Sequence, residues 1–177
     1  MESKDEIMAA KTGTYTLIAS NTLGSAGTTV DFTSISGSYT DLVLIINLKG
    51  NATNTTSGMR FNSDTASNYS ATAISGDSTG AFSWRNTSTT RINMENTGAS
   101  FNNVWGQYVI SIQDYANTTT YKTALIRSGA ATGEVNAIVG LWRATPAAIT
   151  SINLYATSGQ WAAGSTFKLY GIEAGNL

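Results

Sequence analysis

The stretch Tyr39-Thr-Asp-Leu-Val-Leu-Ile-Ile-Asn-Leu48 is the most informative segment of this 177-residue chain for its fold. From Leu42 to Leu48 a large aliphatic residue occupies every second position, which is the repeat of a β-strand and not of a helix. Val43 and Ile45 place apolar side chains on the opposite face as well. A strand that is apolar on both faces is typical of the middle of a sheet. The segment therefore predicts a central strand.

Segments on both sides of this strand are also rich in β-branched or alternating apolar residues, with turn residues between them. They are Tyr15–Ser20, Thr28–Ile35, Met59–Asn62, Tyr69–Ile74, Phe82–Arg85, Arg91–Met94, Gln107–Gln113, Tyr121–Arg127, Val135–Arg143, Ile149–Ala156 and Phe167–Ile172. No stretch after Thr14 keeps a helical period. We therefore expect residues 14–177 to form one all-β domain, an antiparallel β-sandwich of jelly-roll type with about ten strands.

The first thirteen residues differ from the rest of the chain because charge is concentrated there. A capping-box pattern indicates a short helix, and an isolated helix of this length is marginal in water. We interpret residues 1–13 as an arm that orders against a partner, with Lys4, Asp5, Glu6 and Lys11 as candidate partner-binding residues. The alternative is a frayed terminus without a role.

Charged residues make up only 12% of the chain, and ten basic residues are matched by eleven acidic ones. Nucleic-acid binding needs clustered Lys and Arg to displace counterions from phosphates, so we expect no nucleic-acid partner. No apolar run approaches the roughly 20 residues of a membrane span, so we expect no membrane partner. The charged N-terminus lacks the apolar core of a signal peptide. We expect synthesis in a cytoplasm without export by the usual secretory route.

Histidine and cysteine are absent. A Ser-His-Asp triad, a Cys-His pair and a thiolate metal site are therefore excluded. Two carboxylates could still hydrolyse a glycoside, but most acidic residues fall in turns or at strand ends, where Asp favours local backbone hydrogen bonds. A calcium loop around Asn62, Asp64 and Asn68 is conceivable, although it lacks the spacing of a known calcium loop. We predict that the protein is not an enzyme and has no metal or other cofactor.

The four tryptophans lie near loops or strand ends. An exposed indole there can stack on a sugar ring, and we take Trp84 and Trp161 as candidate glycan-stacking residues. The alternative is that tryptophans fill the ends of the core or a subunit interface.

Several short segments of the chain resemble segments of a known group of proteins. They include Tyr15-Thr-Leu-Ile-Ala-Ser20, Arg60-Phe-Asn-Ser-Asp64, Tyr121-Lys-Thr123 and Gly164-Ser-Thr-Phe-Lys-Leu-Tyr-Gly-Ile172. The chain after Thr14 resembles small virion structural proteins of tailed bacteriophages, in particular those of aquatic bacteria and cyanobacteria. Proteins of this group are capsid decoration (cement) proteins, head fibres, or tail-tip and receptor-binding modules. The group offers no catalytic residues to carry over.

The resemblance implies a protein of the virion surface that is made in the cytoplasm of a bacterial host. We expect a capsid decoration protein, a homotrimer bound to the major capsid protein, that stabilises the head shell and is anchored by the arm. The alternative is a tail or head-fibre module that recognises a cell-surface glycan through loop aromatics such as Trp84 or Trp161.

Overall fold

The computed structural model describes residues 14–51, 55–95, 101, 103–130 and 134–173. In this part of the chain the backbone forms twelve β-strands and no helix. The strands are β1 (Tyr15–Thr22), β2 (Thr29–Phe32), β3 (Asp41–Lys49), β4 (Thr56–Phe61), β5 (Tyr69–Asp77), β6 (Gly80–Thr89), β7 (Ile92–Asn93), β8 (Trp105–Ile112), β9 (Lys122–Ala130), β10 (Val135–Trp142), β11 (Ile152–Ser158) and β12 (Thr166–Ile172). Nowhere in the described ranges is there a helix long and apolar enough to cross a membrane.

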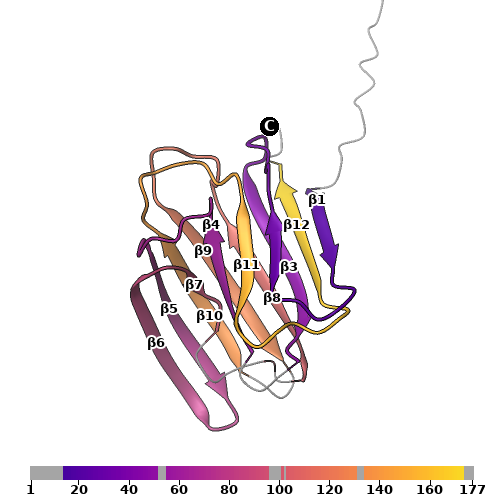
Figure 1. Ribbon diagram of the computed structural model, residues 1–177. Helices are drawn as coiled ribbons and strands as arrows, with labels where there is room; N and C mark the ends of the chain where they lie inside the picture. The colour runs from indigo at the N-terminus through magenta and orange to yellow at the C-terminus, as the bar shows by residue number, and fades with distance from the viewer. Residues whose placement is uncertain (1–13, 52–54, 96–100, 102, 131–133, 174–177) are drawn as a thin grey trace, which may run out of the picture.

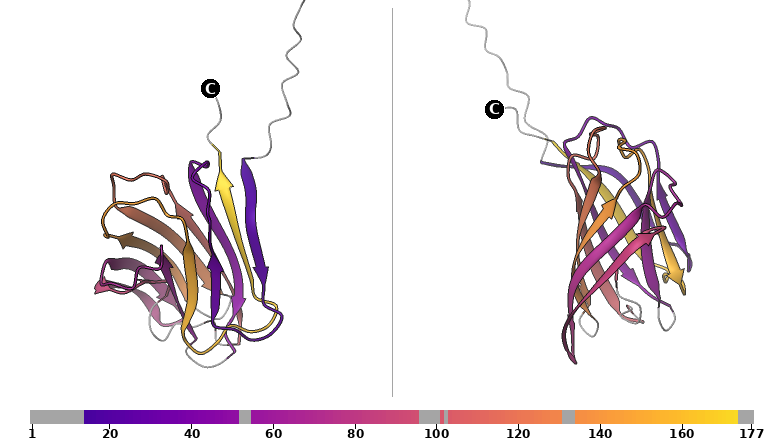
Figure 2. Two further views of the ribbon diagram at one scale, coloured as in Figure 1. Left: turned by 45° about the horizontal axis from the view of Figure 1, so that its top comes forward. Right: turned by 90° about the vertical axis from the view of Figure 1, so that its left-hand side faces the viewer.

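The strands form two antiparallel sheets that lie as two layers (Figures 1 and 2). The large sheet has eight strands in the order β1-β12-β3-β8-β9-β10-β5-β6, and the small sheet has four in the order β2-β11-β4-β7. The prediction of an all-β antiparallel sandwich is confirmed. The strand number is twelve where about ten were expected. The finer assignment to the jelly-roll type stays a prediction.

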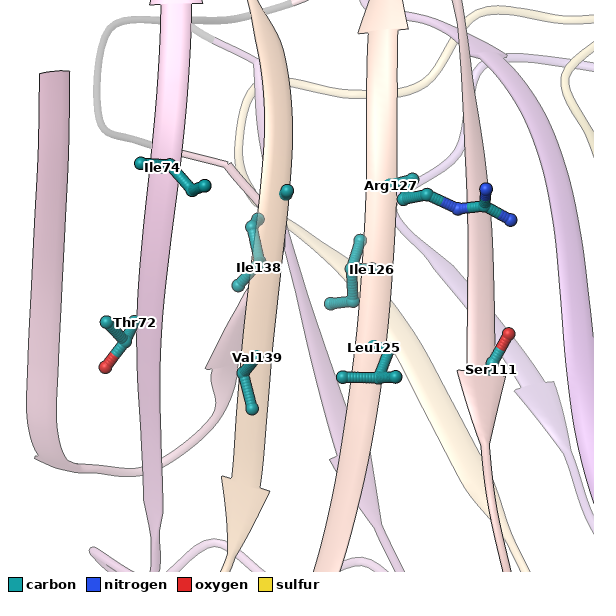
Figure 3. A pocket seen from close by; sticks show the side chains of 9 residues that line it. Thr72, Ile74, Ser111, Leu125, Ile126, Arg127, Ile138 and Val139 are labelled. Atoms are coloured by element: carbon teal, nitrogen blue, oxygen red, sulfur yellow. The ribbon is translucent and has the colours of Figure 1, made fainter. Parts of the chain in front are cut away.

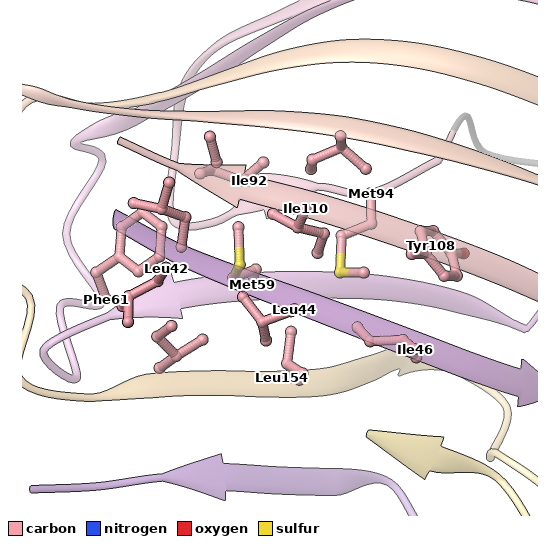
Figure 4. Packing of buried hydrophobic residues seen from close by; sticks show 14 of the residues in the cluster. Leu42, Leu44, Ile46, Met59, Phe61, Ile92, Met94, Tyr108, Ile110 and Leu154 are labelled. Atoms are coloured by element: carbon pink, nitrogen blue, oxygen red, sulfur yellow. The ribbon is translucent and has the colours of Figure 1, made fainter. Parts of the chain in front are cut away.

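The prediction of a central strand is confirmed, because β3 lies between β12 and β8 in the large sheet. The alternate residues from Leu42 to Leu48 are at most 1% exposed and face the small sheet. Figure 4 shows this row packing against Met59, Phe61 and Leu154. Burying one large aliphatic side chain contributes about 1.5–3 kcal/mol relative to leaving it exposed. The hydrophobic core therefore lies between the two layers.

Aromatic side chains extend this core toward the loops. Trp161 forms isolated bridges with Gly27 and Gly50, and its ring lies 4.8 Å from the ring of Phe167. A Cβ on Gly106 would lie 2.2 Å from the ring of Phe101, so that ring rests on bare backbone. Chain segments outside the strands are thereby held against the sheets.

Candidate functional site

The side of the large sheet that faces away from the small sheet carries exposed apolar side chains. The exposed fractions range from 41% at Ile45 to 69% at Ile74, with Leu125, Val135 and Val139 between them. Isolated exposed apolar residues are ordinary on protein surfaces, but a contiguous group indicates a contact surface. Whether these five residues form one group depends on the register of the strands.

The register places them in two adjacent rows that cross five strands. One row joins Val43, Ser111, Leu125, Val139 and Thr72. The next row joins Ile45, Val109, Arg127, Ala137 and Ile74. Val135 lies two positions beyond Ala137 on the same strand face. We call this surface, these two rows together with Val135, the outer apolar face.

A shallow, open depression of about 480 Å³ lies in the outer apolar face (Figure 3). Leu125 and Val139 lie side by side on neighbouring strands, and the Arg127 side chain extends toward β8. Arg127 is the one charged residue at the registered positions of the two rows. Depletion of charge is characteristic of the buried centre of protein interfaces.

The surface continues across β12 to β1 at the edge of the sheet, where the first row stays apolar and the second row adds Lys168, which pairs with Ile45 and Ser20. Leu17 pairs with Tyr170, and Tyr170 pairs with Val43 of the outer apolar face. Tyr15 meets Tyr170 edge to face, with ring centroids 6.1 Å apart. Seven strands at about 4.8 Å spacing and a length of about six residues give a surface of roughly 30 Å by 20 Å. This is the scale of the ~800 Å² that each partner buries in a standard protein interface.

The Asp64 carboxylate closes the turn between β4 and β5. Its Oδ2 accepts hydrogen bonds from Trp142 Nε1 at 2.7 Å and Asn68 Nδ2 at 2.9 Å, and its Oδ1 accepts one from Ala66 N at 2.8 Å. Partial burial raises the pKa of Asp64, but the hydrogen bonds from Trp142, Asn68 and Ala66, together with the charge of Arg60, hold that pKa below its usual value.

The Asn62 carboxamide also forms hydrogen bonds within the protein. Its Oδ1 accepts from Thr150 N at 2.8 Å, and its Nδ2 donates to the Ala148 carbonyl at 2.7 Å. These side chains hold loops together, since their polar atoms are engaged in hydrogen bonds within the protein. In the part of the chain that the structure describes, no three His, Cys, Asp or Glu residues group together to hold a metal ion.

Glu95 is an exception to the expectation that the acids lie in turns. It is buried between the sheets, where its Oε2 accepts a hydrogen bond from Tyr108 Oη at 2.8 Å and its Oε1 accepts one from Ser57 N. Burial raises the pKa of Glu95 to about 8. Glu134 is also buried, and burial raises its pKa as well. Neither carboxyl group is open to a ligand at the surface.

The two tryptophans predicted to stack on sugars take different positions. Trp161 is 1% exposed, and its Nε1 donates to Ser57 Oγ at 3.2 Å. Its ring faces are covered by the protein, which corrects the prediction that it stacks on a glycan. Trp84 is half-buried on the inner side of β6, where its Nε1 donates to Ser75 Oγ at 3.1 Å. The structure does not bring the two together.

The predicted partner-binding residues Lys4, Asp5, Glu6 and Lys11 lie outside the described residues.

The outer apolar face was not predicted as a site. The apolar residues Val43 and Ile45 are its signal in the sequence, but the same pattern predicts only a central strand.

Comparisons with known proteins give no family for this chain. No protein-family model and no curated protein matches it significantly. Among solved structures, a mutant of the alginate lyase Aly36B in complex with alginate tetrasaccharide is 6% identical, with 89% of this chain and 81% of that chain covered and a TM-score of 0.30. A protein of unknown function from Shewanella oneidensis MR-1 is 10% identical, with 97% and 84% covered and a TM-score of 0.22. Similarity this weak carries no information about what this chain does.

Proposed function

We propose that the protein is a structural protein of a bacteriophage virion, a capsid decoration protein whose copies associate through the outer apolar face and stabilise the head shell. The observation that carries the proposal is the two-sided apolar pattern of β3. Leu44 is buried against the small sheet, whereas Ile45 on the other side is 41% exposed. On the outward side of β3, Val43 is 7% exposed but Ile45 is open to water, so a single copy covers this side of the two-sided pattern only in part.

A second copy of the chain is the occupant that suits this surface best. The surface is large enough for a standard interface, and its registered positions carry Arg127 on the central five strands and Lys168 on β12. Interfaces between identical subunits are more apolar than transient ones, and their centres are depleted of charged residues. The homotrimer that the resemblance to virion proteins implies would place this face between neighbouring subunits. Each of Leu125, Val139 and Ile74 would then leave water on assembly.

The assembled trimer must also attach to the head shell. The major capsid protein is the proposed partner of the assembled trimer, with residues 1–13 as the anchoring arm. This role needs rigidity and contact area and no catalysis. A two-layer β-sandwich with a continuous core meets that requirement, because each layer covers the apolar side of the other.

Immunogold labelling of purified virions tests the location. Antibody raised against the recombinant protein should label heads at many positions per particle. Label confined to tails would replace the decoration role with the host-binding one, and unlabelled particles that infect normally would remove the virion role altogether. A particle preparation from a deletion mutant supplies the control for antibody specificity.

The second candidate function is a tail or head-fibre module that recognises a cell-surface glycan. Trp105 at the start of β8 favours it, because this indole is 46% exposed, and an exposed indole can stack on a sugar ring. A glycan array probed with the wild-type protein and a Trp105→Ala variant tests it. A hit that the variant loses would support this function, and an array without hits would count against it.

A further inference from the structure

The outer side of the small sheet carries two arginines on neighbouring strands. The strands β4 and β7 pair Gly58 with Asn93 and Met59 with Ile92. Continuing this register by one position places Arg60 opposite Arg91. Met59 and Ile92 point into the core, so the two arginines point outward. Like charges directly opposite each other on a sheet repel.

Carboxylates near this pair are already engaged elsewhere. Asp31 lies in the same row as Arg60, with Asn153 between them, and its Oδ1 accepts a hydrogen bond from Asn153 Nδ2 at 2.6 Å. Asp64 is close enough for Arg60 to lower its pKa, but its oxygens bind Trp142 and the backbone and side chains of its own loop. Within the described ranges neither arginine forms an ion pair with these carboxylates.

Arg60 is held in a defined orientation. Its Cζ lies 4.5 Å from the centroid of the Tyr155 ring, which is a cation–π contact. Its Nε donates to the Thr90 carbonyl at 2.8 Å. A guanidinium fixed by one edge presents its other edge to a ligand, and a planar guanidinium matches an oxyanion with two parallel hydrogen bonds.

Gly58 allows Arg91 to approach the same place. A Cβ on Gly58 would lie 2.7 Å from Arg91 Cδ and 3.3 Å from Tyr155 Cζ. The Arg91 stem and the Tyr155 ring therefore converge over bare backbone of β4. Arg91 Nε is hidden from water there and has no hydrogen-bond partner in the described part of the chain. The arrangement brings two cations together, and Asp64 offsets the charge of Arg60 only through space.

We propose that the cluster of Arg60, Arg91 and Tyr155 binds the oxyanion group of an acidic polysaccharide. An oxyanion between the guanidinium groups removes their repulsion and accepts charge-assisted hydrogen bonds. Several neighbouring side chains bear hydroxyl or amide groups suited to sugar hydroxyls, namely Thr56, Thr90, Asn93, Asn153 and Thr157. The Asp31 carboxylate, beyond Asn153 in the same row, bounds the site on that side. Duplex nucleic acid fits less well, because its binding rests on many phosphate contacts along a basic stripe.

The polysaccharide site does not depend on the proposed role of the outer apolar face. The two surfaces lie on opposite sides of the sandwich, since one belongs to the small sheet and the other to the large sheet. An assembled particle-surface protein and an unassembled one would both present it. A failure of either proposal leaves the other intact.

Isothermal titration with dextran sulfate and with dextran of the same chain length tests the proposal on the full-length protein. We expect binding of dextran sulfate and none of dextran. Arg60→Gln and Arg91→Gln should each weaken binding about tenfold or more, as expected for the loss of a charge-assisted hydrogen-bonding group. The matched control is Arg85→Gln, an exposed arginine of β6 on the other layer, which should leave affinity within about twofold, since a distant exposed charge is screened by salt.

A melting experiment separates this role from a structural one. Without ligand, Arg91→Gln should melt at the same or a higher temperature than wild type, because it removes a repulsion, while dextran sulfate should raise the melting temperature of the wild type alone. Three results would overturn the proposal: no binding of dextran sulfate, an equal loss in Arg85→Gln, or equally tight binding of duplex DNA.

Discussion

Replacing Glu95 by glutamine removes a buried carboxyl group that links the two sheets. In the wild type this group receives hydrogen bonds from Tyr108 Oη and Ser57 N, and burial raises its pKa to about 8 from the ordinary 4.5. Between pH 4.5 and 8 the folded protein therefore holds a proton that the unfolded chain has lost. Stability must fall as pH rises through this window, because folding requires proton uptake.

The size of the effect follows from the same two pKa values. Each pH unit inside the window lowers the free energy of unfolding by about 1.4 kcal/mol. From pH 4.5 to 7 the accumulated loss is about 3 kcal/mol. Glutamine cannot ionise, so Glu95→Gln should be free of this loss. Changed hydrogen bonding at Tyr108 or Ser57 would offset about 1 kcal/mol of the gain at every pH.

Urea unfolding followed by tryptophan fluorescence at pH 5, 6, 7 and 8 measures this directly. The free energy of unfolding of Glu95→Gln minus that of wild type should increase steadily from pH 5 to pH 8. Glu173→Gln, at an exposed position after β12, is the matched control and should run parallel to wild type. Parallel pH profiles for Glu95→Gln and wild type would refute the account of a buried, protonated carboxyl group.

Two further predictions concern the core. Gly106→Ala should destabilise the fold by about 1–3 kcal/mol because its Cβ would lie 2.2 Å from the Phe101 ring; Gly24→Ala, with nothing within 4 Å, should change little, and equal effects in urea unfolding would contradict the close approach. Trp161→Ala should cost about 3–5 kcal/mol because it empties the space beside Phe167; a loss below about 1 kcal/mol in the same assay would show that the indole is not packed there.

The positions of the strands were predictable because they depend on the local alternation of apolar and polar residues. Every segment with an apolar or β-branched repeat contains a strand, including the two-residue β7. Boundaries were less predictable. The segment Tyr69–Ile74 continues to Asp77, whose Oδ1 accepts hydrogen bonds from Thr79 N at 2.7 Å and Gly80 N at 3.2 Å. This carboxylate stabilises a tight turn, so the two strands of the hairpin extend almost to each other.

The surfaces were not predictable because they depend on register between distant strands. Leu125 and Val139 belong to separate segments, and only the pairing of β9 with β10 makes them neighbours. Arg60 and Arg91 come together in the same way through β4 and β7. Trp161 is the reverse case, because it was predicted to be a surface residue and is buried. Its position between two predicted strands indicated a loop, yet bridges to Gly27 and Gly50 fix it in the core.

The central claim is that the outer apolar face joins copies of the chain, and sedimentation equilibrium of the wild type and Val139→Asp tests it most directly. The wild type should sediment as a trimer. Val139→Asp should sediment as a folded monomer, because a carboxylate at this exposed position stays hydrated in the free subunit and would be buried unpaired in the interface. Thr29→Asp adds the same charge on the small sheet and should remain a trimer. A monomeric wild type, or a Val139→Asp variant that stays a trimer, would contradict the claim.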